Sequence, residues 1–252
     1  MANHFIKERN PAAILLLSPE FSYKYSFKIP DIENFDSLDK QTQDSLLFYN
    51  SKLLQYINDS LLIKSYMNGL SSGLKSLGFN VYTSGTTESF VNRGSDGLIV
   101  NIPQLELEEF FDSISENVVL GDEELYNYEI YITAVNFNSW FELTQVNQQD
   151  SVLVLYSSNS LTDRLDGGFR YFPFSGQVKY EYTIDSLEVK DIYPAAASIG
   201  DLYARLLHNF LMNDYIQKNM ATGYETAKYY TWDPVSGRIR NYKGQKFTRL
   251  ND

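Results

Sequence analysis

The apolar run Ala12-Ala13-Ile14-Leu15-Leu16-Leu17 decides the fold class of this 252-residue chain. It is too short to cross a membrane as a helix, which needs about 20 apolar residues, and it lacks the alternation of a half-exposed strand. Uniformly apolar strands are typical of sheets that are covered on both faces. Residues 12–18 are therefore predicted to form a central strand with helices packed around it.

The segment downstream of this strand predicts a helical unit over residues 41–77. Leucine and isoleucine recur there at helical spacing, and Asn58-Asp59-Ser60 interrupts the pattern with residues that favour a helix N-terminus. The repeating positions are Leu46, Leu53, Ile57, Leu61, Leu70, Leu74 and Leu77. We expect a helix pair or a kinked helix, ended by Gly78 because glycine accepts the left-handed conformation. A strand at residues 80–83 would then run parallel to the first strand through a right-handed crossover.

The remaining pattern predicts further strands, one long helix and a terminal hairpin. Strands are expected at residues 98–102, 126–135, 151–156 and 178–184. Pro103 marks the edge or the end of the first of these. A helix is expected over residues 198–220, with Ser198 and Asp201 at capping-box spacing. Its apolar stripe is Ile199, Leu202, Leu206 and Phe210. Residues 229–242 favour a hairpin around Asp233-Pro234-Val235-Ser236-Gly237.

These elements predict an α/β or α+β fold, with a mixed twisted sheet, two main helical segments packed on it and a C-terminal hairpin. The strands at residues 12–18, 80–83, 98–102 and 152–156 are expected in one sheet. A single α/β domain is predicted over residues 1–252, with residues 225–252 as a C-terminal hairpin appendage. The 20 tyrosines and 16 phenylalanines favour a protein rich in sheet, because aromatic side chains fit a pleated surface.

Composition excludes several classes of function. The chain has no cysteine and only two histidines, which excludes disulfides, thiolate nucleophiles and metal sites rich in either residue. Its net charge of −11 opposes phosphate backbones and anionic lipids, so no nucleic-acid partner is expected. No apolar run reaches the length of a transmembrane helix, and the N-terminus carries no apolar signal core. Met1 is either a natural cytoplasmic start or the replacement of a removed signal.

The run Tyr82-Thr83-Ser84-Gly85-Thr86-Thr87 is similar to the start of the phosphate-binding loop in acyl-adenylate-forming enzymes. In such a loop, glycine exposes backbone N–H groups to phosphate and hydroxyl groups add donors. Here Glu88 places a negative charge at the phosphate position, and the lysine common in that family is missing; Arg93 is the closest cation. We therefore predict no ATP binding. A strand ending in a turn, with Thr86 or Thr87 capping a short helix, explains the run.

Other polar clusters give no positive sign of catalysis. Asp163 and Asp166 supply too few oxygen ligands for a calcium loop, so a polar turn between strands is expected. Glu108-Glu109 and Asp122-Glu123-Glu124 are adjacent acids, which predicts a solvated surface and not an acid–base pair that converges on a cleft. His208 is expected to be a surface or packing residue. The sequence therefore predicts no catalytic, cofactor-binding or metal-binding residue, and no cofactor.

Contact surfaces are predicted at three aromatic places. The runs at residues 21–27 and 169–174 interleave aromatic with polar residues, and Trp232 stands beside the C-terminal turn. Aromatics combined with Lys or Arg are enriched at protein contact surfaces. The alternative is that one aromatic face of each strand lies in the core and that Trp232 staples the hairpin to it.

The order of elements resembles that of bacterial envelope lipoproteins. The matching pieces are Leu74-Lys75-Ser76-Leu77-Gly78-Phe79-Asn80-Val81, Asp96-Gly97-Leu98-Ile99-Val100, Gln104-Leu105-Glu106-Leu107 and Leu202-Tyr203-Ala204-Arg205-Leu206-Leu207. They resemble the ABC-transport auxiliary lipoproteins and the amino-terminal domain of the Tol–Pal translocation protein. The acidic composition, rich in Tyr, Asn, Ser and Phe, also resembles uncharacterised lipoproteins of Bacteroidota.

This resemblance implies a non-enzymatic lipoprotein of the cell envelope that acts through protein contacts in assembly or transport. It implies a place at the periplasmic face of the outer membrane, held by a lipid on a cysteine outside this chain. The residues alone leave open a cytoplasmic or phage-borne interaction protein of the same fold class, or an enzyme whose carboxylates the sequence does not pair. A protein partner is expected, but the sequence predicts neither its identity nor the oligomeric state.

Overall fold

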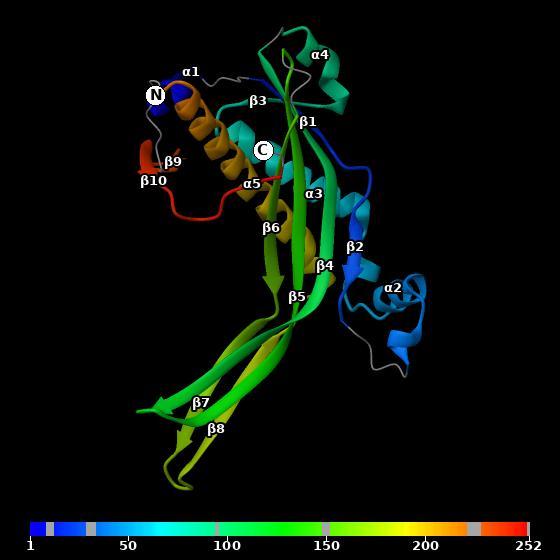
Figure 1. Ribbon diagram of the computed structural model, residues 1–252, viewed down its shortest axis with the longest axis vertical. Helices are drawn as coiled ribbons and strands as arrows, with labels where there is room; N and C mark the ends of the chain where they lie inside the picture. Colours follow the sequence, from blue (N-terminus) through cyan, green and yellow to red (C-terminus); the bar gives the residue numbers. More distant parts are fainter. Residues whose placement is uncertain (9–12, 29–33, 94–95, 148–151, 221–227, 251–252) are drawn as a thin grey trace.

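The structure, a computed structural model, describes residues 1–8, 13–28, 34–93, 96–147, 152–220 and 228–250. A twisted sheet and helices form a body, and long strands leave the body as a projecting arm (Figure 1). The predicted fold class, a mixed α/β sheet with helices packed on it and a C-terminal hairpin, is confirmed.

The main sheet has the strand order β11-β6-β5-β4-β1-β3, and β2 also pairs with β4. β1 pairs in parallel with β3 and β4, β2 pairs in parallel with β4, and the other pairs are antiparallel. The four strands that were predicted to share a sheet do so; residues 12 and 151 lie outside the described part. The strands are β1 (Ala13–Leu17), β2 (Tyr23–Ser26), β3 (Asn80–Thr83), β4 (Gly97–Leu120), β5 (Glu123–Gln145), β6 (Val152–Thr162) and β11 (Thr248–Arg249).

β1 is covered on both faces, as its apolar sequence predicts. Ile14 and Leu16 are buried in the main core. Ala13 and Leu15 point the other way, into a smaller cluster with Phe90 of the short helix α4 (Thr87–Val91). A strand with two buried faces has no position for polar side chains, which explains the unbroken apolar run.

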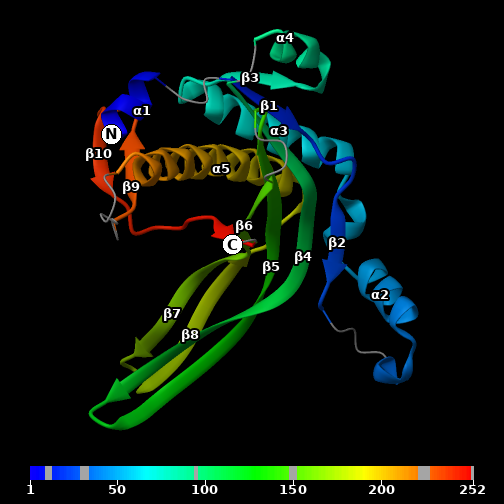
Figure 2. The same ribbon diagram turned by 45° about the horizontal axis from the view of Figure 1, so that its top comes forward.

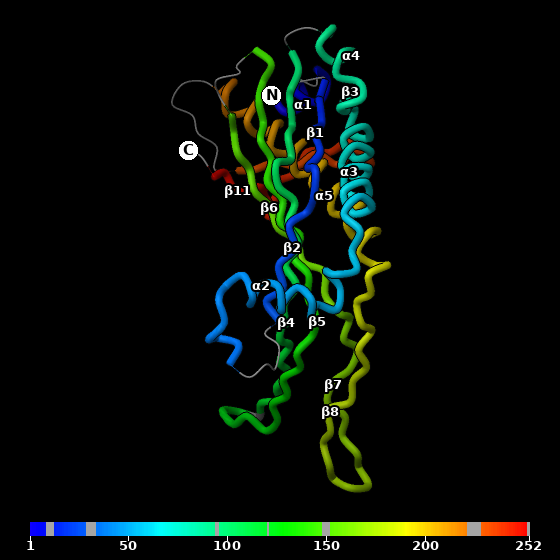
Figure 3. Tube along the Cα trace, turned by 90° about the vertical axis from the view of Figure 1, so that its right-hand side faces the viewer, coloured from blue at the N-terminus to red at the C-terminus, as the bar shows by residue number. Residues whose placement is uncertain are grey.

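Two long helices, α3 (Asp59–Ser76) and α5 (Val189–Lys218), lie on the same side of the sheet (Figure 3). They approach each other closely at glycines. A Cβ atom on Gly200 would lie 2.2 Å from the carbonyl oxygen of Tyr66, and one on Gly69 would lie 1.9 Å from that of Ala197. Further elements of the body are α1 (Ala2–Glu8), α2 (Lys40–Tyr49), and the hairpin of β9 (Tyr230–Asp233) and β10 (Arg238–Asn241).

The helix pair predicted over residues 41–77 is present as α2 and α3. Asn58 caps α3 by accepting a hydrogen bond of 3.0 Å from the backbone N–H of Leu61, and Gly78 follows the helix with a φ of 91°. The predicted place of Leu61 on the buried stripe is wrong, because its side chain is 51% exposed. The next residue, Leu62, is buried in its place. No side chain of α2 is buried.

The last helix begins earlier than its sequence pattern predicts. α5 starts at Val189 and not near Ser198, and its capping box is formed by Glu188 and Asp191. Pro194 lies inside the helix, close to its start. A proline there removes a single intrahelical hydrogen bond, and the adjacent capping box satisfies other N-terminal groups. The buried surface of α5 is also wider than one stripe, since it includes Tyr203, Ala204 and Leu207.

The largest departure from expectation is the length of β4 and β5. Pro103 was expected at the edge or end of a strand, but β4 continues through it to Leu120, and the proline lies at a register irregularity between Asn101 and Gln104. At about 3.3 Å per residue, a strand of 24 residues is about 80 Å long and outreaches the body. The polar turn predicted around Asp163 and Asp166 is wrong for Asp166: Asp163 separates β6 from β7 (Arg164–Phe172), Asp166 lies within β7, and β7 pairs with β8 (Gln177–Asp185).

Candidate functional site: a two-hairpin arm and its polar base

The arm consists of two hairpins that project from the body beyond the helices (Figures 1 and 2). The outer hairpin is residues 110–134 of β4 and β5, and the inner hairpin is β7–β8, residues 164–185. Within the described residues, neither β7 nor β8 pairs with a third strand. A two-stranded hairpin is marginally stable in water by itself, so each hairpin needs the contact with the other.

An aromatic seam holds the two hairpins together. Tyr128 of the outer hairpin stacks on Tyr180 of the inner one, with ring centroids 4.5 Å apart and planes 15° from parallel. Tyr126 lies 6.0 Å from Phe169, and Tyr182 lies 5.9 Å from Tyr128. Aromatic pairs at such distances stabilise beyond the area they bury. The alternating tyrosines of both segments were visible in the sequence, but the pairing between them was not.

Other apolar side chains of the arm face solvent. The most exposed is Phe174 at the tip of the inner hairpin, which is fully exposed, followed by Tyr171 at 65% and Tyr131 at 64%. The remaining members of this exposed set are Phe111, Val119, Leu125 and Ile184. Exposed apolar side chains gathered on one projecting element are typical of interaction sites.

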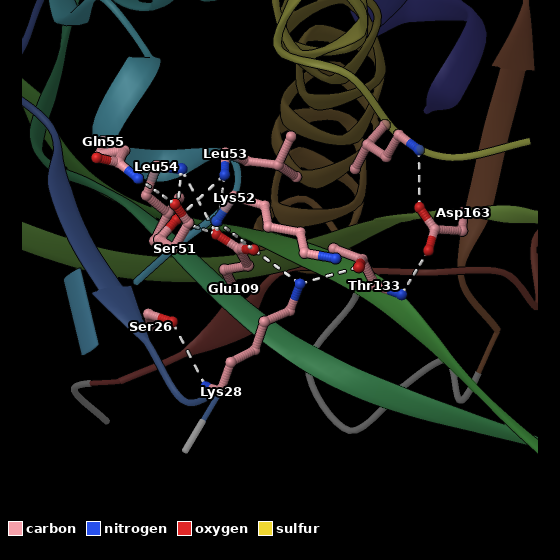
Figure 4. Close-up of polar contacts among 11 residues, drawn as sticks. Ser26, Lys28, Ser51, Lys52, Leu53, Leu54, Gln55, Glu109, Thr133 and Asp163 are labelled. Atoms are coloured by element: carbon pink, nitrogen blue, oxygen red, sulfur yellow. Dashed lines mark hydrogen bonds and ion pairs between the residues drawn. The ribbon is translucent and has the colours of Figure 1, made fainter. Parts of the chain in front are cut away.

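A buried ion pair lies at the base of the arm (Figure 4). Lys28, just after β2, places its Nζ 2.8 Å from Oε1 of Glu109 on β4, and both side chains are buried. The hydroxyl of Ser51 donates to Oε2 of the same carboxylate, and Lys28 also donates to Oγ1 of Thr133 at 2.9 Å. Burial by itself would raise the pKa of Glu109. The hydrogen bonds from Lys28 and Ser51 and the charge of Lys28 together outweigh it and hold that pKa below its usual value.

Asp163 extends this polar base to the inner hairpin. Its Oδ2 accepts a hydrogen bond of 2.7 Å from the backbone N–H of Thr133, and its Oδ1 accepts one of 2.7 Å from the N–H of Leu187 (Figure 4). Asp163 lies between β6 and β7, and Leu187 lies between β8 and α5. Both ends of the inner hairpin are therefore tied to β5 through one carboxylate.

The arrangement at the base positions backbone and does not favour catalysis. Glu109 is neutralised by Lys28, and Asp163 accepts two backbone N–H groups, so the two carboxylates are engaged as acceptors and do not converge on one point. The predicted solvated position is wrong for Glu109, which is fully buried, while Glu108 faces the other side of β4 and is half-buried. The alternation of the strand puts Glu109 inward, where Lys28 offsets its charge.

The structure separates the other predicted candidates. Asp122-Glu123-Glu124 is exposed at the tip of the outer hairpin, as predicted for a solvated acidic surface. In the adenylate-like run, Thr83 and Thr86 cap each other reciprocally where β3 turns into α4, which confirms the strand, turn and short helix. Glu88 is exposed on α4.

His208 and Trp232 are packing residues. His208 is 2% exposed and lies between the rings of Phe5 and Phe79, at centroid distances of 5.5 and 5.8 Å. The half-buried indole of Trp232 covers the same imidazole at 5.4 Å. Of the two interpretations of Trp232, the structure favours the staple between hairpin and core.

The aromatic run at residues 21–27 faces outward. Phe21, Tyr23, Tyr25 and Phe27 are each between 37% and 56% exposed, whereas Ser22 and Ser26 point inward and are buried. The alternative, that the aromatic face of this strand lies in the core, is therefore wrong. The inward side bonds the start of α3 instead: Ser22 donates to Asp59, and Lys24 pairs with the same carboxylate at 2.8 Å.

The described part of the chain contains neither a cluster of metal-ligating side chains nor a membrane-spanning helix. There, no three His, Cys, Asp or Glu side chains gather closely enough to hold a metal ion. In the same residues, no helix is both long and apolar enough to cross a membrane.

No protein-family model matches the chain, and no curated protein matches it. Among solved structures, it is similar to a homolog of the neuraminyllactose-binding hemagglutinin from Helicobacter pylori, at 11% identity and a TM-score of 0.32, over 83% of this chain and 91% of that one. It is also similar to the dodecamer of a PelC point variant from Paraburkholderia phytofirmans, at 10% identity and a TM-score of 0.23, over 75% of this chain and 86% of that one. At these scores the likeness carries no argument about function.

Proposed function

We propose that this protein is a non-enzymatic binding protein of the bacterial envelope, and that its arm is the contact surface through which it takes part in assembly or transport. The projecting arm with its solvent-facing aromatic residues supports this proposal. The polar base supports it too, because its ion pair and hydrogen bonds join the two hairpins to each other and to Lys28, just after β2. Rigid presentation of a contact surface lowers the entropy lost on binding.

The arm is better suited to a protein partner than to a small molecule. Its exposed residues lie on two narrow hairpins and include strand edges that no described strand covers. Such edges bind other polypeptides through their backbone groups, and exposed aromatics supply the apolar contacts.

Chemical cross-linking in a native lysate tests the role of the arm. The double variant Tyr171→Ser/Phe174→Ser removes two exposed aromatics from the inner hairpin, and we expect it to lose the cross-linked partner while its urea midpoint stays unchanged. Tyr49→Ser, a 70% exposed position on α2, is the matched control and should keep the partner. Equal partner yields from all three proteins would refute the arm as the contact surface.

The envelope location rests on the resemblance of the sequence to envelope lipoproteins and is tested separately. The coding sequence upstream of Asn3 should specify a signal peptide that ends in a cysteine for lipid attachment. A natural start at Met1 would contradict the envelope location but would leave the role of the arm intact.

A further inference from the structure

The charge of this acidic chain is divided unevenly between two regions. Residues 228–249, the basic segment, hold six lysines and arginines against one aspartate, a net charge of +5. Residues 110–134, the outer hairpin of the arm, hold six aspartates and glutamates and no lysine or arginine, a net charge of −6. The chain as a whole carries −11, so the basic segment stands out against its surroundings.

The basic segment and α5 together line a cleft of about 420 Å³. Three cations lie along it: Lys228, Lys246 and Arg249. Two of them lie over aromatic rings, with Lys246 Nζ 4.5 Å from the centroid of Tyr229 and the guanidinium of Arg249 5.2 Å from that of Phe210. Cations held over aromatic faces sit beside an apolar surface, which suits a ligand with both acidic and apolar groups.

The acid in this cleft does not cancel its positive charge. Asp214 also lines it and offsets part of the charge of Arg249, 3.5 Å away, but its carboxylate lies closer to Lys218, at 2.8 Å, and one acid stands against three cations. Burial raises the pKa of the Tyr229 hydroxyl well above its usual value, so this group is neutral at physiological pH. The cleft therefore presents net positive charge.

The tip of the outer hairpin has the complementary chemistry. Gly121, with a φ of 64°, makes the turn, and Asp122, Glu123 and Glu124 follow it with exposed side chains. Leu125 comes next and is 46% exposed. Acidic and apolar groups thus lie side by side on a narrow loop.

The tip cannot enter the cleft of its own molecule. It lies at the free end of the arm, whereas β11 and the C-terminal half of α5 lie in the body, well away from it in all three views (Figures 1, 2 and 3). We infer that the acidic tip of one molecule docks into the basic cleft of a second copy of this chain. This inference rests on the proposed function, in which the arm is a contact surface, and it names the partner.

The two surfaces are different, so the contact is head to tail. Each molecule that receives a tip still offers its own, and such contacts close into rings or continue as chains. Interactions between exposed charges depend on ionic strength, since the screening length falls from about 8 Å in physiological salt to about 3 Å at 1 M salt. The association is therefore weaker in high salt.

Sedimentation velocity of the whole chain over a concentration series tests this inference. Wild type should self-associate in low salt and dissociate in high salt. Glu123→Lys and Lys246→Glu should each weaken self-association by about tenfold or more, because each puts like charges across the interface. The double variant Glu123→Lys/Lys246→Glu should restore the association, because the exchanged charges attract again.

Matched charge changes away from both surfaces serve as controls. Glu88→Lys on α4 and Lys64→Glu on α3 are exposed positions and should associate like wild type. A wild type that stays monomeric at every concentration, or a double variant weaker than both single variants, would overturn the inference. If wild type stays monomeric while Tyr171→Ser/Phe174→Ser still loses its cross-linked partner, the arm keeps its proposed role and only the second copy is excluded as partner.

Discussion

Lys28 and Glu109 form a buried ion pair, with Nζ and Oε1 2.8 Å apart, although they lie far apart in the sequence. The pair joins the end of β2 to the point where β4 leaves the body. Such a pair is costly to break on one side only, because the remaining charge is then buried without compensation.

Replacing Lys28 tests the energy of this pair. We expect Lys28→Met to lower the free energy of unfolding by about 3–5 kcal/mol, measured by urea denaturation, because it leaves the buried Glu109 carboxylate without a counter-charge. The double variant Lys28→Met/Glu109→Leu should regain much of the loss. Lys190→Met, which breaks the exposed pair with Glu188, should cost much less, because solvent screens that pair. Equal losses in the two lysine variants would contradict the buried pair.

The same carboxylate makes stability depend on pH. The pKa of Glu109 is lowered in the folded protein from 4.5, so near that pH the unfolded chain binds more protons than the folded chain. The stability from this group is therefore present above pH 4.5 and is lost as the pH falls through the folded pKa. We expect Glu109→Gln to be less stable than wild type at neutral pH, with the difference shrinking in acid. Urea midpoints of both proteins over an acidic pH series measure this, and a constant difference would contradict it.

The close crossing of α3 and α5 requires glycine at residue 200. Gly200→Ala would bring a Cβ atom to 2.2 Å from the backbone oxygen of Tyr66, which cannot move without shifting α3. We expect a loss of about 1–3 kcal/mol in thermal or urea denaturation, as for overpacked cores. Gly85→Ala is the control, because a Cβ atom there meets nothing within 4 Å. A Gly200→Ala protein as stable as the control would rule out the crossing.

The aromatic seam of the arm is tested through hydrogen exchange. Tyr128→Ala removes the ring that stacks on Tyr180, so amides of residues 164–185 should exchange faster while the body exchanges as before. Tyr131→Ala, at a 64% exposed position of the same strand, should leave that exchange unchanged. Equal exchange rates of the β7–β8 amides in the two variants would show that the hairpins do not depend on the seam.

Trp232 should act as a staple. Trp232→Ala is expected to lower stability by about 1–3 kcal/mol, below the value for a fully buried tryptophan, because its indole is half-buried against His208. Val235→Ala, in the exposed turn of the same hairpin, should have little effect. Unchanged folding of Trp232→Ala together with a lost partner would instead favour a contact role for this residue.

Hydrophobic pattern predicted the body well because burial there follows local periodicity. A few neighbouring residues were enough to predict three features: the apolar strand β1, the end of α3 before Gly78, and the turn before Gly237. In the arm, the alternating segments at residues 126–135 and 178–184 were predicted correctly and lie within β5 and β8. The outer part of β4 was not predicted, because it faces solvent and lacks an apolar alternation. Pro103 was predicted to mark the edge or the end of a strand. Only the pairing of β4 with β5 shows that the strand continues through the proline at a register irregularity.

The sequence by itself determined the fold class, the central strand, the caps of α3 and the absence of cysteine chemistry, because these depend on residue type and on short-range spacing. Tertiary structure alone decided which charges are buried and which aromatics are displayed. Glu109 and Glu108 are adjacent acids in the sequence, yet strand alternation turns Glu109 toward Lys28 and Glu108 away from it. The partner that stabilises such a side chain comes from a distant segment, and no local pattern records which segment that is.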